Sequence, residues 1–235
     1  MISRREALGA GAALLSTALL PTWAKAATQA GVSRAGRVRL ANGRCLSYHE
    51  FGIPTGPLVF YFHGTPGSSL EAGLIEHEAC LAGVHLVSVD RPGMGHSTYY
   101  CGRRILDWPC DVEQLADILG YGGTSFGVVG LSGGAPYASV CARMIPHRLT
   151  HVAIVSGHAE LGAPGVSAGS EDDAIALITR RPRLACKGLN FIARRLDRKP
   201  DHVIAKITKD WSAADRELVL CNPRYLSLIH ISEPT

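Results

Sequence analysis

Four short apolar runs, separated by segments of helical pattern, constrain the fold of this chain more than any other feature. The runs span residues 58–62, 85–89, 126–131 and 149–155. The intervening segments 70–81, 107–119 and 133–144 are long enough to form crossover helices. Strands that alternate with helices in this way pair in parallel, because each helix returns the chain to the same end of the sheet. The sequence therefore predicts an α/β fold with a mainly parallel sheet.

The parallel part is preceded by a different signal. Residues 37–40 and 45–51 alternate apolar and polar side chains on either side of Asn42-Gly43. An Asn-Gly pair between such segments favours a tight hairpin turn, since both residues tolerate positive φ. We therefore expect an antiparallel hairpin to open the sheet.

Composition excludes several functional classes. The chain has 235 residues, 46% of them hydrophobic, 19% charged, and a net charge of +4, which is typical of a globular protein and does not favour a nucleic-acid partner. A cluster of basic residues is expected to form a solvated helix face. Its members are Arg180, Arg181, Arg183, Arg194, Arg195, Arg198 and Lys199.

The seven cysteines include no Cys-x-x-Cys pair and no Cys/His spacing suited to zinc. We therefore expect no metal site and no cofactor. Cys101 and Cys110 are close enough in sequence to pair across a loop in an oxidising compartment, and the odd total leaves at least one thiol free or the chain incomplete.

The first 26 residues have the pattern of an export signal. Ser3-Arg4-Arg5-Glu6 precedes a small apolar stretch, residues 7–20, and Ala24-Lys25-Ala26 offers a small-x-small cleavage site. The paired arginines resemble the twin-arginine signal. We expect a protein exported to the periplasm through export machinery that recognises this segment, with an uncleaved anchor or a general secretory signal as the alternatives.

The pattern Gly-x-Ser-x-Gly occurs three times, around Ser125, Ser132 and Ser167. A nucleophile elbow requires a buried strand before the serine and a helix after it, because the sharp turn lifts the hydroxyl above the sheet. Ser125 precedes its strand, and Ser167 has no strand before it. Only Ser132 satisfies both requirements, which makes it the predicted catalytic nucleophile.

The residues around Ser132 suggest an oxyanion hole. Gly130 and Gly134 stand two positions from the serine, where side chains would collide as strand and helix pack. The N–H of Gly133 is one expected oxyanion donor. The loop at residues 63–69 follows the first strand of the parallel set, and we predict that Thr65 provides the second donor.

Three motifs together resemble the α/β-hydrolase fold family, in the branch of small esterases and proline-iminopeptidase-like hydrolases. They are His63-Gly64-Thr65-Pro66-Gly67, Asp90-Arg91-Pro92-Gly93-Met94-Gly95-His96-Ser97 and Gly130-Leu131-Ser132-Gly133-Gly134. The resemblance implies a family core over residues 27–157 and a helical cap over 158–225. It also implies a triad acid and histidine later in the chain.

Neither later triad member is recognisable. Glu160 occupies a position that a minority of relatives use for the acid. His63, His96 and His158 precede the position of the family's histidine and are expected to stabilise loops or to line the pocket. Residues 226–235, including His230, resemble a translated sequencing adapter and are interpreted as an artefactual tail. The sequence thus predicts a truncated hydrolase in which the last strands, the acid and the histidine are missing.

The leading hypothesis is a serine hydrolase that acts on a small-molecule ester or amide through an acyl-enzyme. Alternatives are an aminopeptidase, a cofactor-free haloperoxidase and a non-catalytic ligand-binding protein, since one fold hosts several functions. A fragment without the acid and histidine is expected to turn over poorly.

Overall fold

The computed structural model describes residues 34–65, 67–157, 180–209 and 211–220. Residues 1–26, the predicted export signal, and residues 226–235, interpreted from the sequence as an artefactual tail, lie outside these ranges. The chain divides into two compact units, Met1–Val155 and Ser156–Thr235, which are treated separately below.

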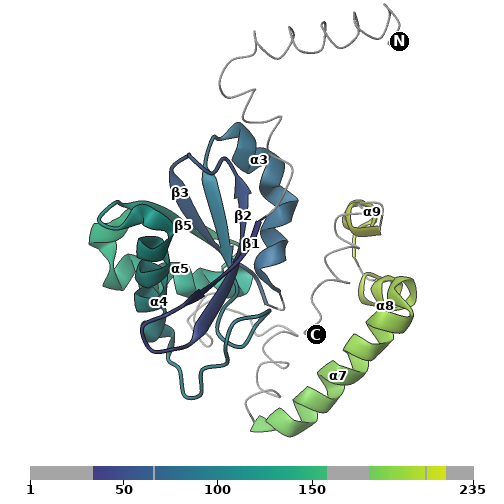
Figure 1. Ribbon diagram of the computed structural model, residues 1–235. Coiled ribbons are helices and arrows are strands. Elements are labelled where there is room, and N and C mark those ends of the chain that lie inside the picture. Colours follow the sequence, from purple (N-terminus) through teal and green to yellow (C-terminus); the bar gives the residue numbers. More distant parts are fainter. Residues whose placement is uncertain (1–33, 66, 158–179, 210, 221–235) are drawn as a thin grey trace, which may run out of the picture. The chain divides into compact units, whose positions relative to one another are not determined.

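A six-stranded sheet forms the centre of the first unit (Figure 1). The strand order is β1-β2-β4-β3-β5-β6, and the parallel pairs are β3 with β4, β3 with β5 and β5 with β6. β1 and β2 form the antiparallel hairpin at one edge, and β2 also runs antiparallel to β4. The strands are β1 (Arg34–Arg39), β2 (Cys45–Gly52), β3 (Leu58–Phe62), β4 (His85–Val89), β5 (Phe126–Leu131) and β6 (Leu149–Val155). The predicted α/β fold with a mainly parallel sheet is confirmed.

Helices cover both faces of this sheet. The full helices are α3 (Glu76–Leu81), α4 (Trp108–Ala116) and α5 (Ala135–Met144). Shorter helical turns are η1 (Ser69–Ile75), η2 (Ile105–Asp107), η3 (Asp117–Tyr121), η4 (Ser132–Gly134) and η5 (Pro146–Arg148).

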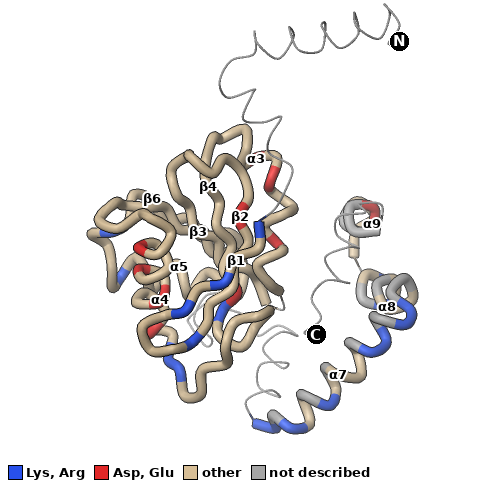
Figure 2. Tube along the Cα trace, in the orientation of Figure 1, with Lys and Arg blue, Asp and Glu red and all other residues tan. Residues whose placement is uncertain are grey.

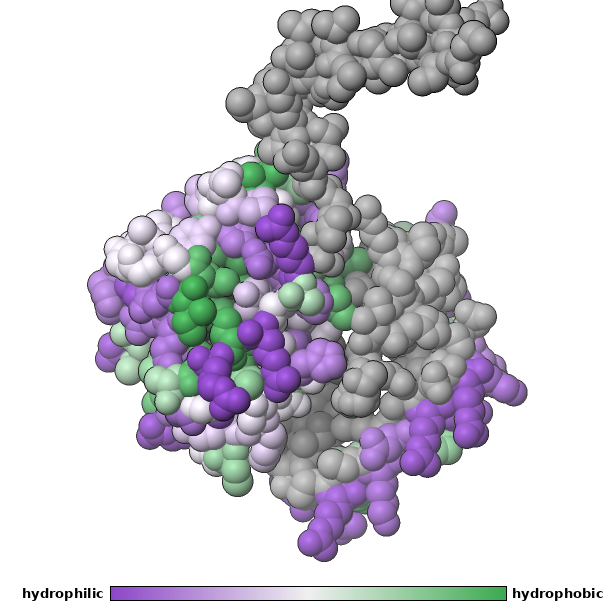
Figure 3. Space-filling view, in the orientation of Figure 1, coloured by the Kyte–Doolittle hydropathy of each residue, from purple (hydrophilic) through white to green (hydrophobic). Residues whose placement is uncertain are grey.

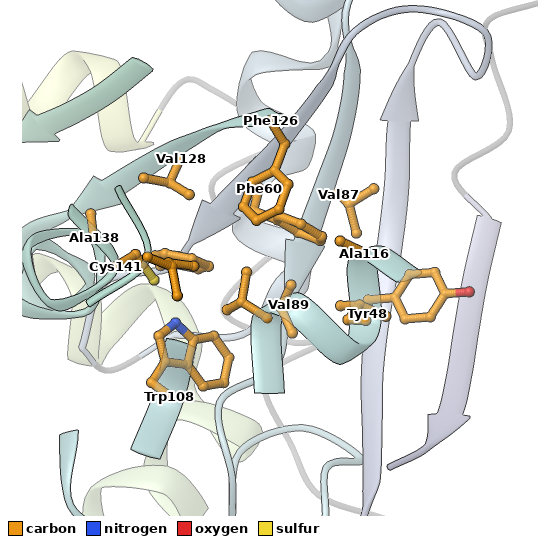
Figure 4. Close-up of a cluster of buried hydrophobic side chains, with 14 of the residues drawn as sticks. Tyr48, Phe60, Val87, Val89, Trp108, Ala116, Phe126, Val128, Ala138 and Cys141 are labelled. Carbon is orange, nitrogen blue, oxygen red and sulfur yellow. The ribbon is translucent and has the colours of Figure 1, made fainter. Parts of the chain in front are cut away.

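The larger core lies between the sheet and the helices α4 and α5 (Figure 4). Trp108 contacts Phe62 edge to face with ring centroids 5.3 Å apart, and Phe60 contacts Phe126 in the same manner at 5.1 Å. The second cluster lies on the opposite face, where Phe51 and Tyr61 pack with side chains of η1 and α3. Burial on both faces explains why β3, β4 and β5 are apolar runs without alternation.

One predicted helix differs from the structure. Residues 70–81 form the tight turn η1 followed by α3 instead of a continuous α-helix. The N–H of Ser69 donates to Asp90 Oδ1 at 2.7 Å, and Glu71 accepts the Gly64 N–H at 3.0 Å. These contacts with neighbouring loops anchor the first turn, which departs from the regular α-helical hydrogen-bond pattern.

β6 forms the other edge of the sheet, and within the described ranges no strand pairs with its outer side. Its side chains Val152, Ile154 and Val155 are exposed. The expectation that further strands follow β6 stays a prediction.

The second unit contains α7 (Pro182–Arg198), α8 (Pro200–Ile207) and α9 (Ala213–Leu220). Figure 2 shows Lys and Arg along α7, and Figure 3 shows hydrophilic residues along this helix. All seven residues of the predicted basic cluster are exposed. The helical cap over residues 158–225 and the absence of a nucleic-acid partner stay predictions. In the part of the chain that the structure describes, no helix combines the length and apolar character needed to cross a bilayer.

Candidate active site

Ser132 lies at the sharp turn between β5 and α5. Its backbone φ is +46°, in the left-handed region that non-glycine residues adopt at an energetic cost. A half-buried serine in this conformation, between a buried strand and a helix, has the geometry of a nucleophile elbow. Of the other two serines in this pattern, Ser125 lies in an exposed segment before β5 and Ser167 lies outside the described residues.

Two glycines allow this turn to pack closely. A Cβ atom on Gly130 would lie 2.5 Å from the carbonyl oxygen of Gly134. A Cβ atom on Gly134 would collide with the carbonyl oxygen of Phe62 at the end of β3. Real side chains do not approach backbone atoms so closely, so both positions require glycine for steric reasons.

The loop after β3 meets the elbow at the positions that the sequence predicts. A Cβ atom on Gly133 would lie 3.1 Å from the backbone nitrogen of Thr65 and would collide with its hydroxyl. A Cβ atom on Gly64 would lie 3.7 Å from the Cβ atom of Ser132. The tertiary structure thus brings together Ser132, Gly133 and Thr65, although their chemical roles remain predictions.

The polar groups of Gly64 are fully engaged. Its N–H donates to the carboxylate of Glu71, with distances of 3.0 and 3.2 Å to the two oxygens. Its carbonyl oxygen lies 2.9 Å from His63 Nδ1 and 2.8 Å from Arg91 Nη2. The next N–H, that of Thr65, has no hydrogen-bond partner among the described residues. It is therefore a backbone donor of this loop that is available to a ligand.

Arg91 connects the loop after β3 with the elbow at Ser132. Its Nη1 donates to the carbonyl oxygen of Gly133 at 2.6 Å, and its Nη2 donates to Thr65 Oγ1 at 2.8 Å. The residue is 1% exposed. Sequence reasoning recorded Arg91 as part of a family-like motif but assigned it no role. It missed Glu71 altogether, because no local pattern links Glu71 to Gly64.

His63 is held in the neutral state. Burial away from water, followed by the positive charge of Arg91, lowers the pKa of His63 to about 4. The Arg91 backbone N–H donates to His63 Nε2 at 3.4 Å, so we assign the remaining proton to Nδ1, which lies 2.9 Å from the Gly64 carbonyl oxygen. Arg91 Nη2 also lies 3.3 Å from Nδ1, a longer contact that this assignment leaves unbonded. His63 is thus a loop-positioning residue, as the sequence predicts.

Asp90 anchors the next loop against the hairpin. Its carboxylate accepts the Ser69 N–H and the Ser47 hydroxyl, both at 2.7 Å. The Ser97 hydroxyl donates to the Asp90 carbonyl oxygen, also at 2.7 Å. A Cβ atom on Gly95, which has a φ of +49°, would collide with the Asp90 side chain. These hydrogen bonds hold residues 90–97, the motif after β4, in a fixed loop next to the site.

No histidine side chain forms a hydrogen bond with Ser132 Oγ within the described residues. His96 is exposed on its loop. Glu160, His158 and His230 lie outside the described ranges. The same ranges contain no group of three or more His, Cys, Asp or Glu side chains that could hold a metal ion.

Comparison with protein families and solved structures places this geometry in a known class. The model of the alpha/beta hydrolase family matches residues 58–230. The chain therefore belongs to the alpha/beta hydrolase family, and this membership supports hydrolytic activity. No curated protein matches the sequence.

Two solved structures share the fold over most of the chain. A thioesterase domain from the curacin biosynthetic pathway is 16% identical, with a TM-score of 0.56, over 87% of this chain and 70% of that chain. A hydrolase from Pseudomonas aeruginosa PA01 is 17% identical, with a TM-score of 0.57, over 86% of this chain and 69% of that chain. Epoxide hydrolase A from Mycobacterium thermoresistibile is 25% identical over 52% of this chain and 39% of that chain, with a TM-score of 0.46. At these identities the structural similarity supports the fold, not a substrate.

Proposed function

We propose that the protein is a serine hydrolase in which Ser132 attacks the carbonyl carbon of a small-molecule ester or amide. Two observations together carry the proposal: the left-handed backbone of Ser132, at +46°, and the Thr65 N–H, which donates to no described residue. A hydroxyl raised in this way can approach a carbonyl carbon while nearby N–H groups accept its oxygen.

The reaction follows from these positions. The Ser132 hydroxyl loses its proton to a base as its oxygen bonds to the carbonyl carbon, and the N–H groups of Thr65 and Gly133 stabilise the resulting oxyanion. Collapse of this intermediate expels the protonated alcohol or amine and leaves an acyl-enzyme, which water hydrolyses. Each oxyanion donor contributes about 10² to 10³ in rate in other hydrolases. The base and its orienting carboxylate are proposed to come from residues outside the described ranges.

Covalent labelling tests the proposal. The full-length protein is treated with a fluorophosphonate probe, and the modified residue is identified by peptide mass spectrometry. We expect labelling at Ser132, its loss in Ser132→Ala, and no change in the matched variant Ser125→Ala. A folded wild-type protein that is not labelled would overturn the serine mechanism and favour a ligand-binding role.

Substrate preference needs a separate comparison. p-Nitrophenyl acetate and proline p-nitroanilide distinguish an esterase from an aminopeptidase. A halide- and peroxide-dependent bromination assay tests the haloperoxidase alternative.

We also propose export through the segment that contains Arg4 and Arg5. The double change Arg4→Lys and Arg5→Lys is expected to retain the protein in the cytoplasm, because twin-arginine recognition depends on the pair. Fractionation of a bacterial host measures this. Unchanged export of the double variant would contradict the proposal.

A further inference from the structure

We propose that Arg91 is a positioning residue of the oxyanion hole, which orients the Thr65 N–H and places a buried positive charge without a direct ion pair beside it. The inference rests on the proposed function. It concerns a residue that does not contact the substrate and acts through the two peptide groups it binds.

The first argument is planarity of the peptide bond. The Gly64 carbonyl and the Thr65 N–H belong to one rigid peptide unit and point in opposite directions. Arg91 Nη2 donates to that carbonyl at 2.8 Å, and the His63 Nδ1–H donates to the same oxygen. Fixing the carbonyl on the buried side therefore fixes the direction of the Thr65 N–H, whose nitrogen would lie 3.1 Å from a Cβ atom on Gly133.

The second argument is that one guanidinium binds both halves of the site. While Nη2 holds the loop after β3, Nη1 donates to the Gly133 carbonyl oxygen at 2.6 Å. The loop and the elbow come from segments far apart in sequence, and Arg91 joins them through a planar group with separate donors. A lysine ammonium at this position could supply the charge but could not span both carbonyls with fixed geometry.

The third argument is charge. Arg91 is 1% exposed, yet among the described residues no carboxylate lies within ion-pair distance of it. Its guanidinium lies 4.8 Å from the centroid of the Tyr137 ring, a contact that also confines it. Burial lowers the pKa of Arg91, and the Glu71 carboxylate opposes this shift from beyond ion-pair distance. A buried cation without a direct ion pair is costly. An oxyanion at the Thr65 and Gly133 N–H groups would add a second negative charge near it during the reaction.

The test compares Arg91→Lys and Arg91→Met with Val112→Ala, a buried α4 variant chosen as a control for lost stability. All variants are made in the full-length protein, and urea unfolding verifies that each is folded under assay conditions. Fluorophosphonate labelling of Ser132 and hydrolysis of p-nitrophenyl acetate are then measured.

We expect kcat and the labelling rate to fall about tenfold to a hundredfold in Arg91→Met, with KM changed less than about threefold, because oxyanion stabilisation acts in the transition state. Arg91→Lys should recover part of the rate through its charge. A merely structural role would lower kcat and the labelling rate by the same factor in Arg91→Met and Val112→Ala. That result would overturn the inference about Arg91 but not the proposed function. Absence of Ser132 labelling in the wild-type protein would instead overturn the proposed function and this inference with it.

Discussion

The Glu71 carboxylate accepts the backbone N–H of Gly64, so the loop after β3 is held by a side chain from the following helical turn. The same carboxylate accepts the Tyr61 hydroxyl at 2.8 Å. With the Gly64 N–H occupied, the Thr65 N–H is the next donor along the loop. Glu71 thereby keeps the Gly64 N–H from serving as a donor to a ligand.

Removal of this acceptor should destabilise the loop. In Glu71→Ala the buried Gly64 N–H loses its partner, and we expect the free energy of unfolding to fall by about 1–3 kcal/mol. Glu71→Gln keeps one acceptor oxygen and should lose less. Urea unfolding of both variants measures the difference, and equal losses would mean that the hydrogen bond contributes nothing specific.

Relief of backbone strain at Ser132 should stabilise the protein while removing its nucleophile. Ser132→Gly tolerates the φ of +46° and should gain up to about 1 kcal/mol relative to Ser132→Ala, after the entropy cost of glycine. Ser156→Gly is the matched control, since Ser156 has a φ of +49°. The thermal unfolding midpoint should rise for both glycine variants, but only Ser132→Gly should abolish fluorophosphonate labelling. A Ser132→Gly variant less stable than Ser132→Ala would contradict the strain argument.

The neutral state of His63 should make the protein less stable in mild acid. Its pKa is about 4 in the folded state and 6.5 in the unfolded state, so the unfolded chain binds the extra proton as the pH falls between these values. Stability should therefore be fully present above pH 6.5 and decline by about 3 kcal/mol towards pH 4.

His63→Asn isolates this contribution. Asparagine can still donate to the Gly64 carbonyl but cannot be protonated in this range. Urea unfolding at pH 7, 6, 5 and 4 should show a shallower decline for the variant than for the wild type. Parallel curves would assign the acid sensitivity to other groups.

The cysteines of the sheet unit should differ in reactivity. Burial raises the pKa of Cys141 to about 12, whereas Cys101 and Cys110 are exposed and not bonded to each other. A thiol reagent at pH 8 should modify Cys101 and Cys110 first and Cys141 only after unfolding. Peptide mass spectrometry over time measures the order, and early modification of Cys141 would show that α5 opens readily.

Local pattern was sufficient to predict the elements of the sheet and the sharp turn at Ser132 between strand and helix. The runs that become β3, β4 and β5 are apolar because they are buried, and the Asn42-Gly43 turn requires residues that accept positive φ. Gly130 and Gly134 could also be predicted from the local sequence, because a sharp turn between strand and helix leaves no room for side chains. In each case the determining contacts lie close in sequence or follow a repeating period.

Contacts between distant segments decided the rest. Strand order, which places β3 between β4 and β5, brings Thr65 to Gly133, and this depends on packing that no local pattern encodes. Arg91 binds residues 27 and 42 positions away, and its partners are backbone carbonyls, which every residue type carries. The sequence alone was therefore enough to predict Ser132 as the nucleophile. Arg91 and Glu71, which hold the peptide groups around the predicted oxyanion donors, could be recognised only from the tertiary structure.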